Sequence, residues 1–137
     1  MTIRPYNKAK DRDSVFRIWR EIGWLKKEKH QEEAFDRLLG CSRVMVGCIA
    51  GQAESAVTIT DGTMRYLEKE LPFACVTGVG TSHVARKQGL AKKILAQMLA
   101  DEAARGVPLA GLGIFEQGFY NALGFGNGAY EHWFCFD

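Results

Sequence analysis

The sequence predicts an α/β (α+β) fold in which a single mixed, largely antiparallel sheet is flanked by helices. The first observation is a pair of apolar runs, 43–50 and 53–60, joined by a two-residue turn, which is typical of a β-hairpin. The second is an apolar run, 73–81, followed by an amphipathic segment and another apolar run, 107–114. That order predicts a strand–helix–strand unit beside the hairpin, with helices packed on one sheet.

Length and composition fit one domain spanning residues 1–137. The chain is 47% hydrophobic and 25% charged, and a chain of this size supports one sizeable core. Its net charge is only +2, whereas proteins that bind nucleic acid usually carry a much stronger basic surface. No apolar run approaches the ~20 residues needed to cross a bilayer, and the first residues lack the plan of a signal peptide. We therefore expect a cytoplasmic location, with no nucleic-acid or membrane partner.

A metal site is not expected either. The four cysteines show no C-x-x-C spacing, and the three histidines are scattered along the chain. A zinc site would need several such residues at short, regular spacings.

The first half of the chain is expected to begin with a short strand over residues 2–6. Asp11 or Asp13 is then expected to cap a helix with apolar residues at helical spacing, which Gly23 ends or bends. A charged stretch follows, and a second short helix is expected over 34–39.

The later elements are read in the same way. The dipeptide Asp61-Gly62 predicts a turn after the second hairpin strand. A well-formed amphipathic helix is expected over 89–105, since its apolar residues keep helical spacing. A short helix over 116–122 and a closing strand over 130–136 complete the expected order.

The most informative segment joins the strand 73–81 to the long helix that follows it. A basic loop with Arg86 and Lys87 leads into Gly89, where the helix opens. The first N–H groups of a helix lack partners within it and carry positive partial charge, so they bind anions. Because Gly89 and Ala91 leave the approach uncrowded, a diphosphate can come close to the backbone. The segment therefore predicts a pyrophosphate cradle.

Other interpretations of this segment were weighed. The Walker pattern G-x-x-x-x-G-K-[ST] is absent, and Gly78 and Gly80 lack the third glycine of the Rossmann pattern. The plainest alternative is a solvated loop over 86–88 before a helix that merely begins at Gly89. The position of the segment, between a buried strand and an amphipathic helix, favours the cradle.

Residues 86–91 (R-K-Q-G-L-A) match [RQ]-x-x-G-x-[GA], the acetyl-CoA signature of the GNAT superfamily of N-acetyltransferases. The sequence resembles that superfamily over essentially its whole length. Residues 119–125 (F-Y-N-A-L-G-F) are similar to the family's later F-Y-x-x-x-G-F motif, and 76–90 with 119–126 look closest to the acetyltransferase domain of the enhanced-intracellular-survival type. The resemblance implies the GNAT fold and acetyl-CoA as cosubstrate.

The resemblance also assigns residues to the acetyl-CoA site. The backbone of Val79, Gly80 and Thr81 would bond the pantetheine arm, and an amide near Val79 would polarise the thioester carbonyl. The pyrophosphate would lie on cradle amides beside Arg86, and Asn121 would line the channel. The cradle amides belong to Lys87, Gln88, Gly89, Leu90 and Ala91.

Tyr120 matches the tyrosine that protonates the departing CoA thiolate in similar enzymes. The alternative is an aromatic side chain that packs beside Phe119 and Phe125. The general base stays open, because the strand 73–81 contains no carboxylate. Candidates are Glu116, His83 and the terminal Asp137, and Glu116 is taken with Tyr120 as the catalytic pair.

The expected function is the transfer of an acetyl group from acetyl-CoA to a primary amine of a small molecule or peptide. Two alternatives stay open: a CoA-binding module without efficient turnover, and half of a larger or oligomeric acetyltransferase, with a homodimer as one form. A third, a nucleic-acid or anion binder, fits poorly with the small net charge. Trp19, Trp24 and Trp133 are expected to be core or interface aromatics first and walls of the acceptor pocket second.

Overall fold

The computed structural model describes residues 1–113, 116, 118–128 and 135. The elements are β1 (Thr2–Pro5), α1 (Lys8–Glu21), α2 (Lys29–Cys41), β2 (Arg43–Ile49), β3 (Gln52–Tyr66), β4 (Lys69–Thr81), a 3₁₀ turn η1 (His83–Ala85), α3 (Leu90–Ala104), β5 (Leu109–Gly111) and a second 3₁₀ turn η2 (Asn121–Leu123).

The five described strands form one open sheet in the order β1-β2-β3-β4-β5. The first four pair antiparallel, and β5 pairs parallel with β4. The parallel pair is connected through α3, as the strand–helix–strand pattern predicts. The expected mixed, largely antiparallel sheet is therefore confirmed.

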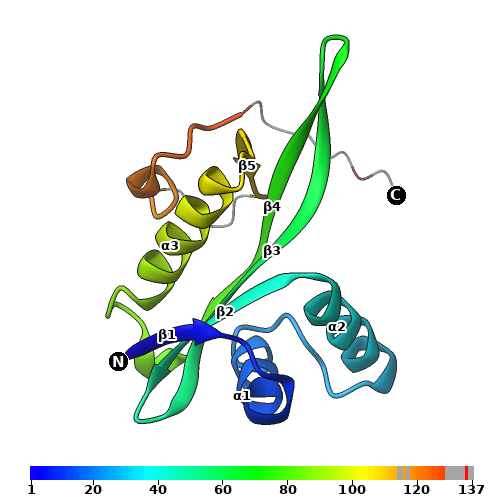
Figure 1. Ribbon diagram of the computed structural model, residues 1–137. Helices are drawn as coiled ribbons and strands as arrows, with labels where there is room; N and C mark the ends of the chain where they lie inside the picture. Colours follow the sequence, from blue (N-terminus) through cyan, green and yellow to red (C-terminus); the bar gives the residue numbers. More distant parts are fainter. Residues whose placement is uncertain (114–115, 117, 129–134, 136–137) are drawn as a thin grey trace.

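Helices cover both faces of this sheet, with α3 on one side and α1 and α2 on the other (Figure 1). The α1–α2 side holds a core in which Phe16, Ile18 and Trp19 of α1 are fully buried against β2 and β3. On the other side, Ile94, Leu95 and Met98 of α3 pack with residues of β3 and β4. The two cores hold β4 between α1 and α3, and the site described below lies along that strand.

The start of α1 differs from expectation. Asn7 is the N-cap residue, and Asp11 lies in the first turn. The Asp11 carboxylate accepts the Asn7 amide at 2.7 Å and two hydrogen bonds from the Arg4 guanidinium at 2.6 and 2.7 Å. Capping by Asp11 or Asp13 was wrong because the helix begins one turn earlier. Asp11, which is 2% exposed, instead ties β1 to α1.

The second helix is longer than the predicted 34–39, because its first turns carry charged side chains that give no apolar pattern. Those charges hold α2 on α1. The Arg12 guanidinium donates to both carboxylate oxygens of Asp36 at 2.9–3.1 Å, and Arg20 pairs with Glu32. Tertiary ion pairs therefore extend a helix that periodicity alone ends too early.

The predicted turn at Asp61-Gly62 was wrong. Both residues lie inside β3, where Asp61 pairs with Ala74 and Gly62 with Phe73. The hairpin turns instead beyond Tyr66, and it projects from the rest of the domain (Figure 1). Cross-strand pairing, with two hydrogen bonds of 2.8 Å from Arg43 to Asp61, keeps this Asp-Gly pair extended.

The C-terminal expectations are met only in part. The strand predicted over 107–114 is confirmed over Leu109–Gly111. In place of a helix over 116–122 there is the 3₁₀ turn η2, whose short span follows from glycines on both sides of it. The strand expected over 130–136 falls largely outside the described residues.

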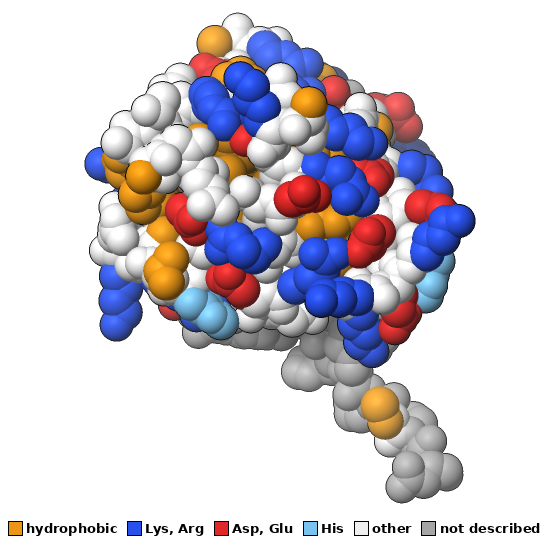
Figure 2. All heavy atoms as spheres, turned by 90° about the horizontal axis from the view of Figure 1, so that it is seen from below, with side chains coloured by type: hydrophobic (Ala, Val, Ile, Leu, Met, Phe, Trp, Pro, Cys, Tyr) orange, Lys and Arg blue, Asp and Glu red, His pale blue; other side chains and the backbone are white. Residues whose placement is uncertain are grey.

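The face viewed in Figure 2 carries basic and acidic side chains interspersed, without a continuous basic patch. Several charged side chains of the domain are paired with one another, as Arg17 is with Glu21 and Glu54. None of the helices in the described part of the chain is long and apolar enough to cross a bilayer.

Candidate active site

A β-bulge interrupts the pairing of β3 with β4. Ala56 pairs with Gly80 and Thr58 with Thr77, so that Gly78 and Val79 together lie opposite Val57. A bulge of this kind bends the strand and changes the direction of its backbone groups. Val79 therefore has no single partner residue on β3, and regular pairing resumes at Gly80.

Gly78 is required at this bulge. Its φ of 58° lies in the left-handed region, and a Cβ there would stand 3.1 Å from Thr58 Oγ1 and 3.1 Å from Trp19 Cζ2. Neither partner is free to move, because Thr58 and Trp19 are fully buried. The close packing of α1 under β4 therefore fixes the bulge.

On its other edge β4 separates from β5. The two strands pair only from Phe73 to Cys75, against Leu109 to Gly111. No described strand pairs with this edge of β4 beyond Cys75, so the backbone from Val76 to Thr81 has no strand beside it there. The separation opens a cavity of about 350 Å³.

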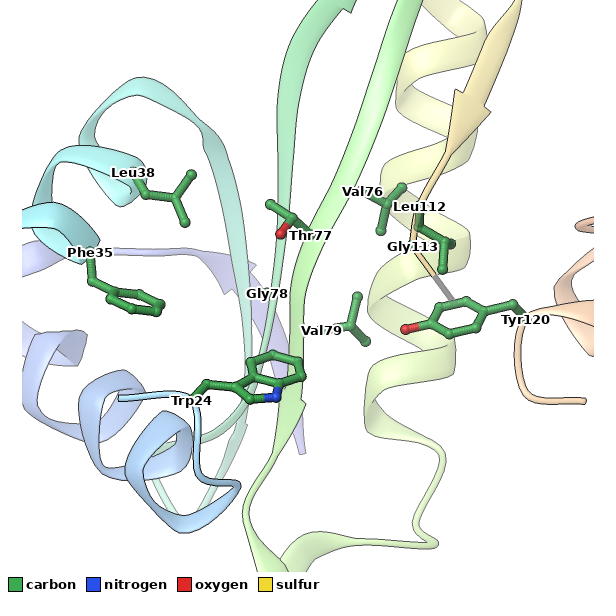
Figure 3. Close-up of a pocket in the computed structure, with 10 residues that line it drawn as sticks. All are labelled: Trp24, Phe35, Leu38, Val76, Thr77, Gly78, Val79, Leu112, Gly113 and Tyr120. Carbon is green, nitrogen blue, oxygen red and sulfur yellow. The ribbon is translucent and has the colours of Figure 1, made fainter. Parts of the chain in front are cut away.

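The cavity is lined from both faces of the sheet (Figure 3). Trp24, Phe35 and Leu38 come from the α1–α2 side, and Tyr120 lies across β4 with its hydroxyl pointing toward Val79. The remaining lining residues are Val76, Thr77, Gly78, Val79, Leu112 and Gly113. Tyr120 is the one titratable residue among these ten. The described wall is thus almost wholly uncharged.

Tyr120 is held by aromatic contacts. Its ring lies edge-on to Phe119 at 5.0 Å and to Phe125 at 6.0 Å between centroids. The residue is 8% exposed, and burial, followed by the negative charge of Glu116, raises the pKa of its phenol. A phenol with a raised pKa keeps its proton at neutral pH, so Tyr120 is available as a proton donor.

The predicted cradle lies at the N-terminus of α3. No side chain caps this helix, and Gly89, with φ of 74°, is its N-cap residue. Within the described chain, the amides of Lys87, Gln88, Gly89, Leu90 and Ala91 donate to no backbone or side-chain acceptor. An ideal Cβ on Gly89 would meet no atom within 4 Å. Amides without an acceptor, beside a glycine that leaves the approach open, are what an anion site at a helix N-terminus needs.

Positive charge and backbone strain both occur at the cradle. Arg86 and Lys87 are exposed beside the free amides. Lys87 adopts φ of 62°, a left-handed conformation that costs a non-glycine residue about 1 kcal/mol or more. Strained backbone concentrates at functional sites, where the surrounding structure maintains it.

Three other predicted site residues, Gly80, Thr81 and Asn121, are not among the residues that line the cavity. Gly80 and Thr81 continue β4 past the bulge, and the Gly80 carbonyl accepts the Ser55 hydroxyl at 2.9 Å. Asn121 is exposed, and its side-chain amide accepts the Gly118 amide at 3.0 Å and donates to the Phe125 carbonyl at 2.9 Å. Asn121 therefore shapes the loop that carries Tyr120.

Neither of the two candidate bases that the structure describes, Glu116 and His83, is among the residues lining the cavity. Glu116 is exposed, although its charge acts on Tyr120. His83 is exposed at the start of η1, where its backbone amide donates to Glu21 Oε2 at 3.1 Å. Asp137 lies outside the described residues. Among the residues that the structure describes, no group of three or more His, Cys, Asp or Glu side chains is arranged to hold a metal ion.

Sequence reasoning missed most of the α1–α2 wall. Trp19 is a core residue, as expected, whereas Trp24 is 37% exposed and lines the cavity, and Trp133 is not described. Phe35 and Leu38 lie on a helix whose apolar spacing indicates a packed face but does not say what that face contacts. Only the fold brings them opposite β4.

Comparisons with known proteins identify the family and the fold. Residues 2–128 match the family model described as an acetyltransferase (GNAT) domain. No curated protein matches the chain significantly.

Solved structures share the fold at low sequence identity. A probable N-acyltransferase from Enterococcus faecalis superposes with a TM-score of 0.81 at 23% identity, over 88% of this chain but only 31% of that longer chain. Glucosamine-6-phosphate N-acetyltransferase from Arabidopsis thaliana superposes with a TM-score of 0.76 at 14% identity, over 99% of this chain and 98% of that one.

An aminoglycoside 6'-N-acetyltransferase from Acinetobacter haemolyticus gives a TM-score of 0.76 at 15% identity, over 100% of this chain and 99% of that one. At these identities the likeness concerns the fold. The match of the family model over nearly the whole chain goes further, and the protein belongs to the GNAT family of acetyltransferases.

Proposed function

We propose that this domain, residues 1–137, transfers an acetyl group from acetyl-CoA to a primary amine of a small molecule or peptide. The observation that carries the proposal is the continuity of three features along β4 and its exit: the cavity beside β5, the bulge at Gly78 and Val79, and the free amides before α3.

The residues at the α3 N-terminus fit the diphosphate of the donor. The amides of Lys87 to Ala91 would each donate to a phosphate oxygen, with Arg86 supplying formal charge alongside. The free edge of β4 at Val79, Gly80 and Thr81 would bond the pantetheine arm, as an added strand bonds to a sheet edge. Asn121 would border this channel.

The thioester would then lie in the cavity, between Val79 and Tyr120. As the amine nitrogen attacks the carbonyl carbon, a C–N bond forms, negative charge grows on the carbonyl oxygen, and the C–S bond breaks. A backbone amide near Val79 would stabilise that charge. The Tyr120 phenol would give its proton to the departing thiolate.

Glu116 remains the proposed acceptor of the amine proton. It is a described carboxylate whose charge reaches Tyr120, and it would act from outside the cavity through water. Glu116→Gln tests this role: a base acting there predicts a slower acetyl transfer at neutral pH that recovers as the pH is raised.

Turnover separates an enzyme from a CoA-binding module. CoA should raise the thermal midpoint, because a ligand that binds only the folded state stabilises it. Acetyl-CoA mixed with a panel of primary amines should then release free thiol. A thermal shift without thiol release on any amine would favour the non-catalytic module instead.

Three finer assignments belong to the same proposal. The motif-bearing stretches 76–90 and 119–126 support closeness to the enhanced-intracellular-survival type. A longer or homodimeric assembly is the second; this chain spans 31% of the longer E. faecalis chain. The third is a cytoplasmic location, where acetyl-CoA would be available as the donor. Sedimentation of the purified protein tests the homodimer.

A further inference from the structure

We infer that the acceptor of this reaction is a primary amine on an apolar body, aromatic or branched aliphatic, that enters from the α1–α2 side and packs against Trp24, Phe35 and Leu38. The inference rests on the proposed function and names its substrate class. It follows from the walls of the cavity, the placement of charge around it, and the protonation of amines.

The two faces of β4 divide the cavity. The cradle and α3 lie on the same side as Val76 and Tyr120, so the donor would occupy that side. The α1–α2 side is left for the acceptor, and its three described walls are Trp24, Phe35 and Leu38 (Figure 3). All three are large hydrophobic side chains.

Two of these walls, Phe35 and Leu38, lie on α2, which packs on α1. Phe35 packs against the fully buried Trp19, with ring centroids 4.5 Å apart and an interplanar angle of 53°. Leu38 lies one turn further along α2, which ion pairs hold on α1. The surface is therefore ordered before any acceptor arrives, and little conformational entropy is lost on binding.

Among the residues that the structure describes, no charged side chain lines this side of the cavity. Two carboxylates of α2 are paired with basic side chains, Asp36 with Arg12 and Lys8, and Glu32 with Arg20. A polycationic aminoglycoside needs carboxylates in its site, and a phosphosugar needs cations. The described lining offers neither, so it does not match the acceptors named for the two structural neighbours.

The small volume also limits the acceptor. About 350 Å³ is near the lower end for small-molecule pockets, and the acetyl end of the donor must share it. A compact amine fits these conditions better than a multi-ring sugar.

An apolar wall also favours the reactive form of the amine. A free alkylamine has a pKa of about 10.4, so roughly one molecule in 2,500 is unprotonated at pH 7. Burial without a counter-charge lowers such a pKa by up to about 3–5 units. An uncharged pocket would thus bind the neutral, nucleophilic amine, which reduces what a distant base such as Glu116 must do.

The test compares four amines by thiol release from acetyl-CoA: 2-phenylethylamine, isopentylamine, glucosamine-6-phosphate and kanamycin. We expect kcat/KM at least about tenfold higher for the two apolar amines, since a well-filled hydrophobic pocket discriminates by about 10–200-fold. Leu38→Asn should raise KM for 2-phenylethylamine about tenfold. The exposed Arg37→Asn on the same helix is the matched control and should leave KM unchanged.

Binding is also read without turnover. In the CoA complex, 2-phenylethylamine should shift tryptophan emission to shorter wavelength, because it covers Trp24, which is 37% exposed. Trp24→Phe should remove that shift while the CoA thermal shift persists. Thiol release with glucosamine-6-phosphate or kanamycin but not with the apolar amines would overturn this acceptor class and leave the proposed function standing. A CoA thermal shift with neither thiol release nor a change in tryptophan emission with any amine would overturn both.

Discussion

Replacing Gly89 tests the cradle most directly. Gly89 has φ of 74°, and its Cβ would project into open space in front of the free amides at the start of α3. Gly89→Val would fill that space and distort the amides. The fold has no contact to lose there, so the cost is limited to left-handed strain of about 1–2 kcal/mol.

The expected changes in the thermal midpoint follow from the length of the chain. At about 2.1 cal/mol/K per residue, 137 residues give an unfolding entropy of about 0.29 kcal/mol/K. CoA at a hundred times its Kd stabilises by about 2.7 kcal/mol, or about 9 °C in the thermal midpoint. The strain at residue 89 lowers the midpoint without ligand by about 3–7 °C. Gly89→Val should therefore lower the thermal midpoint of the ligand-free protein by about 3–7 °C. It should also abolish the rise of about 9 °C that CoA produces in the wild type.

Gly106, at the other end of α3, provides the matched control. Its φ is 81°, and a Cβ there would also meet no atom within 4 Å. It lies about 22 Å from the cradle along the helix, since each residue rises about 1.5 Å. Differential scanning fluorimetry should give Gly106→Val the same loss of stability and an intact CoA shift. A full CoA shift in Gly89→Val would refute the cradle.

Three further changes follow from the same structure. Tyr120→Phe should lower kcat about 100-fold and spare the CoA shift; and because the raised pKa of Tyr120 keeps the phenol protonated, wild-type turnover measured by thiol release should not fall as pH rises until above 10. Unchanged kcat in this variant would remove Tyr120 from the acid role. Gly78→Ala should cost about 2 kcal/mol in urea unfolding, through left-handed strain and contact with Trp19 and Thr58, and should slow thiol release as the bulge shifts; a variant as stable and active as wild type would contradict that packing. Asp11→Asn should cost about 2–3 kcal/mol at pH 7, because it leaves Arg4 without its partner. The Arg4 hydrogen bonds hold the pKa of Asp11 below its ordinary 3.8, so this stabilisation is complete above pH 4 and is lost as pH falls through the lowered value. Urea unfolding across that range should show the gap between variant and wild type closing, and a gap that stays constant would contradict the ion pair.

Local chemistry explains which predictions succeeded. The α3 helix and the strand before it were found because apolar spacing reports burial along a single element. The strand-to-helix junction was predicted correctly because the unpaired amides of a helix N-terminus depend on the neighbouring residues alone, here Arg86 to Ala91. The binding of a diphosphate there stays a prediction. The turn at Asp61-Gly62 failed for the complementary reason, since pairing with Phe73 and Ala74 overrode the local preference.

The amino-acid sequence by itself determined the strand-to-helix junction at Arg86 to Ala91 and the aromatic run around Tyr120, because each is a contiguous segment. Tertiary structure alone decided the bulge opposite Val57, the opening between β4 and β5, and the meeting of Trp24, Phe35 and Leu38 with Val79. Those residues are some 40 to 55 positions apart in the chain. Only sheet register and helix packing, which sum many distant contacts, bring them to one cavity.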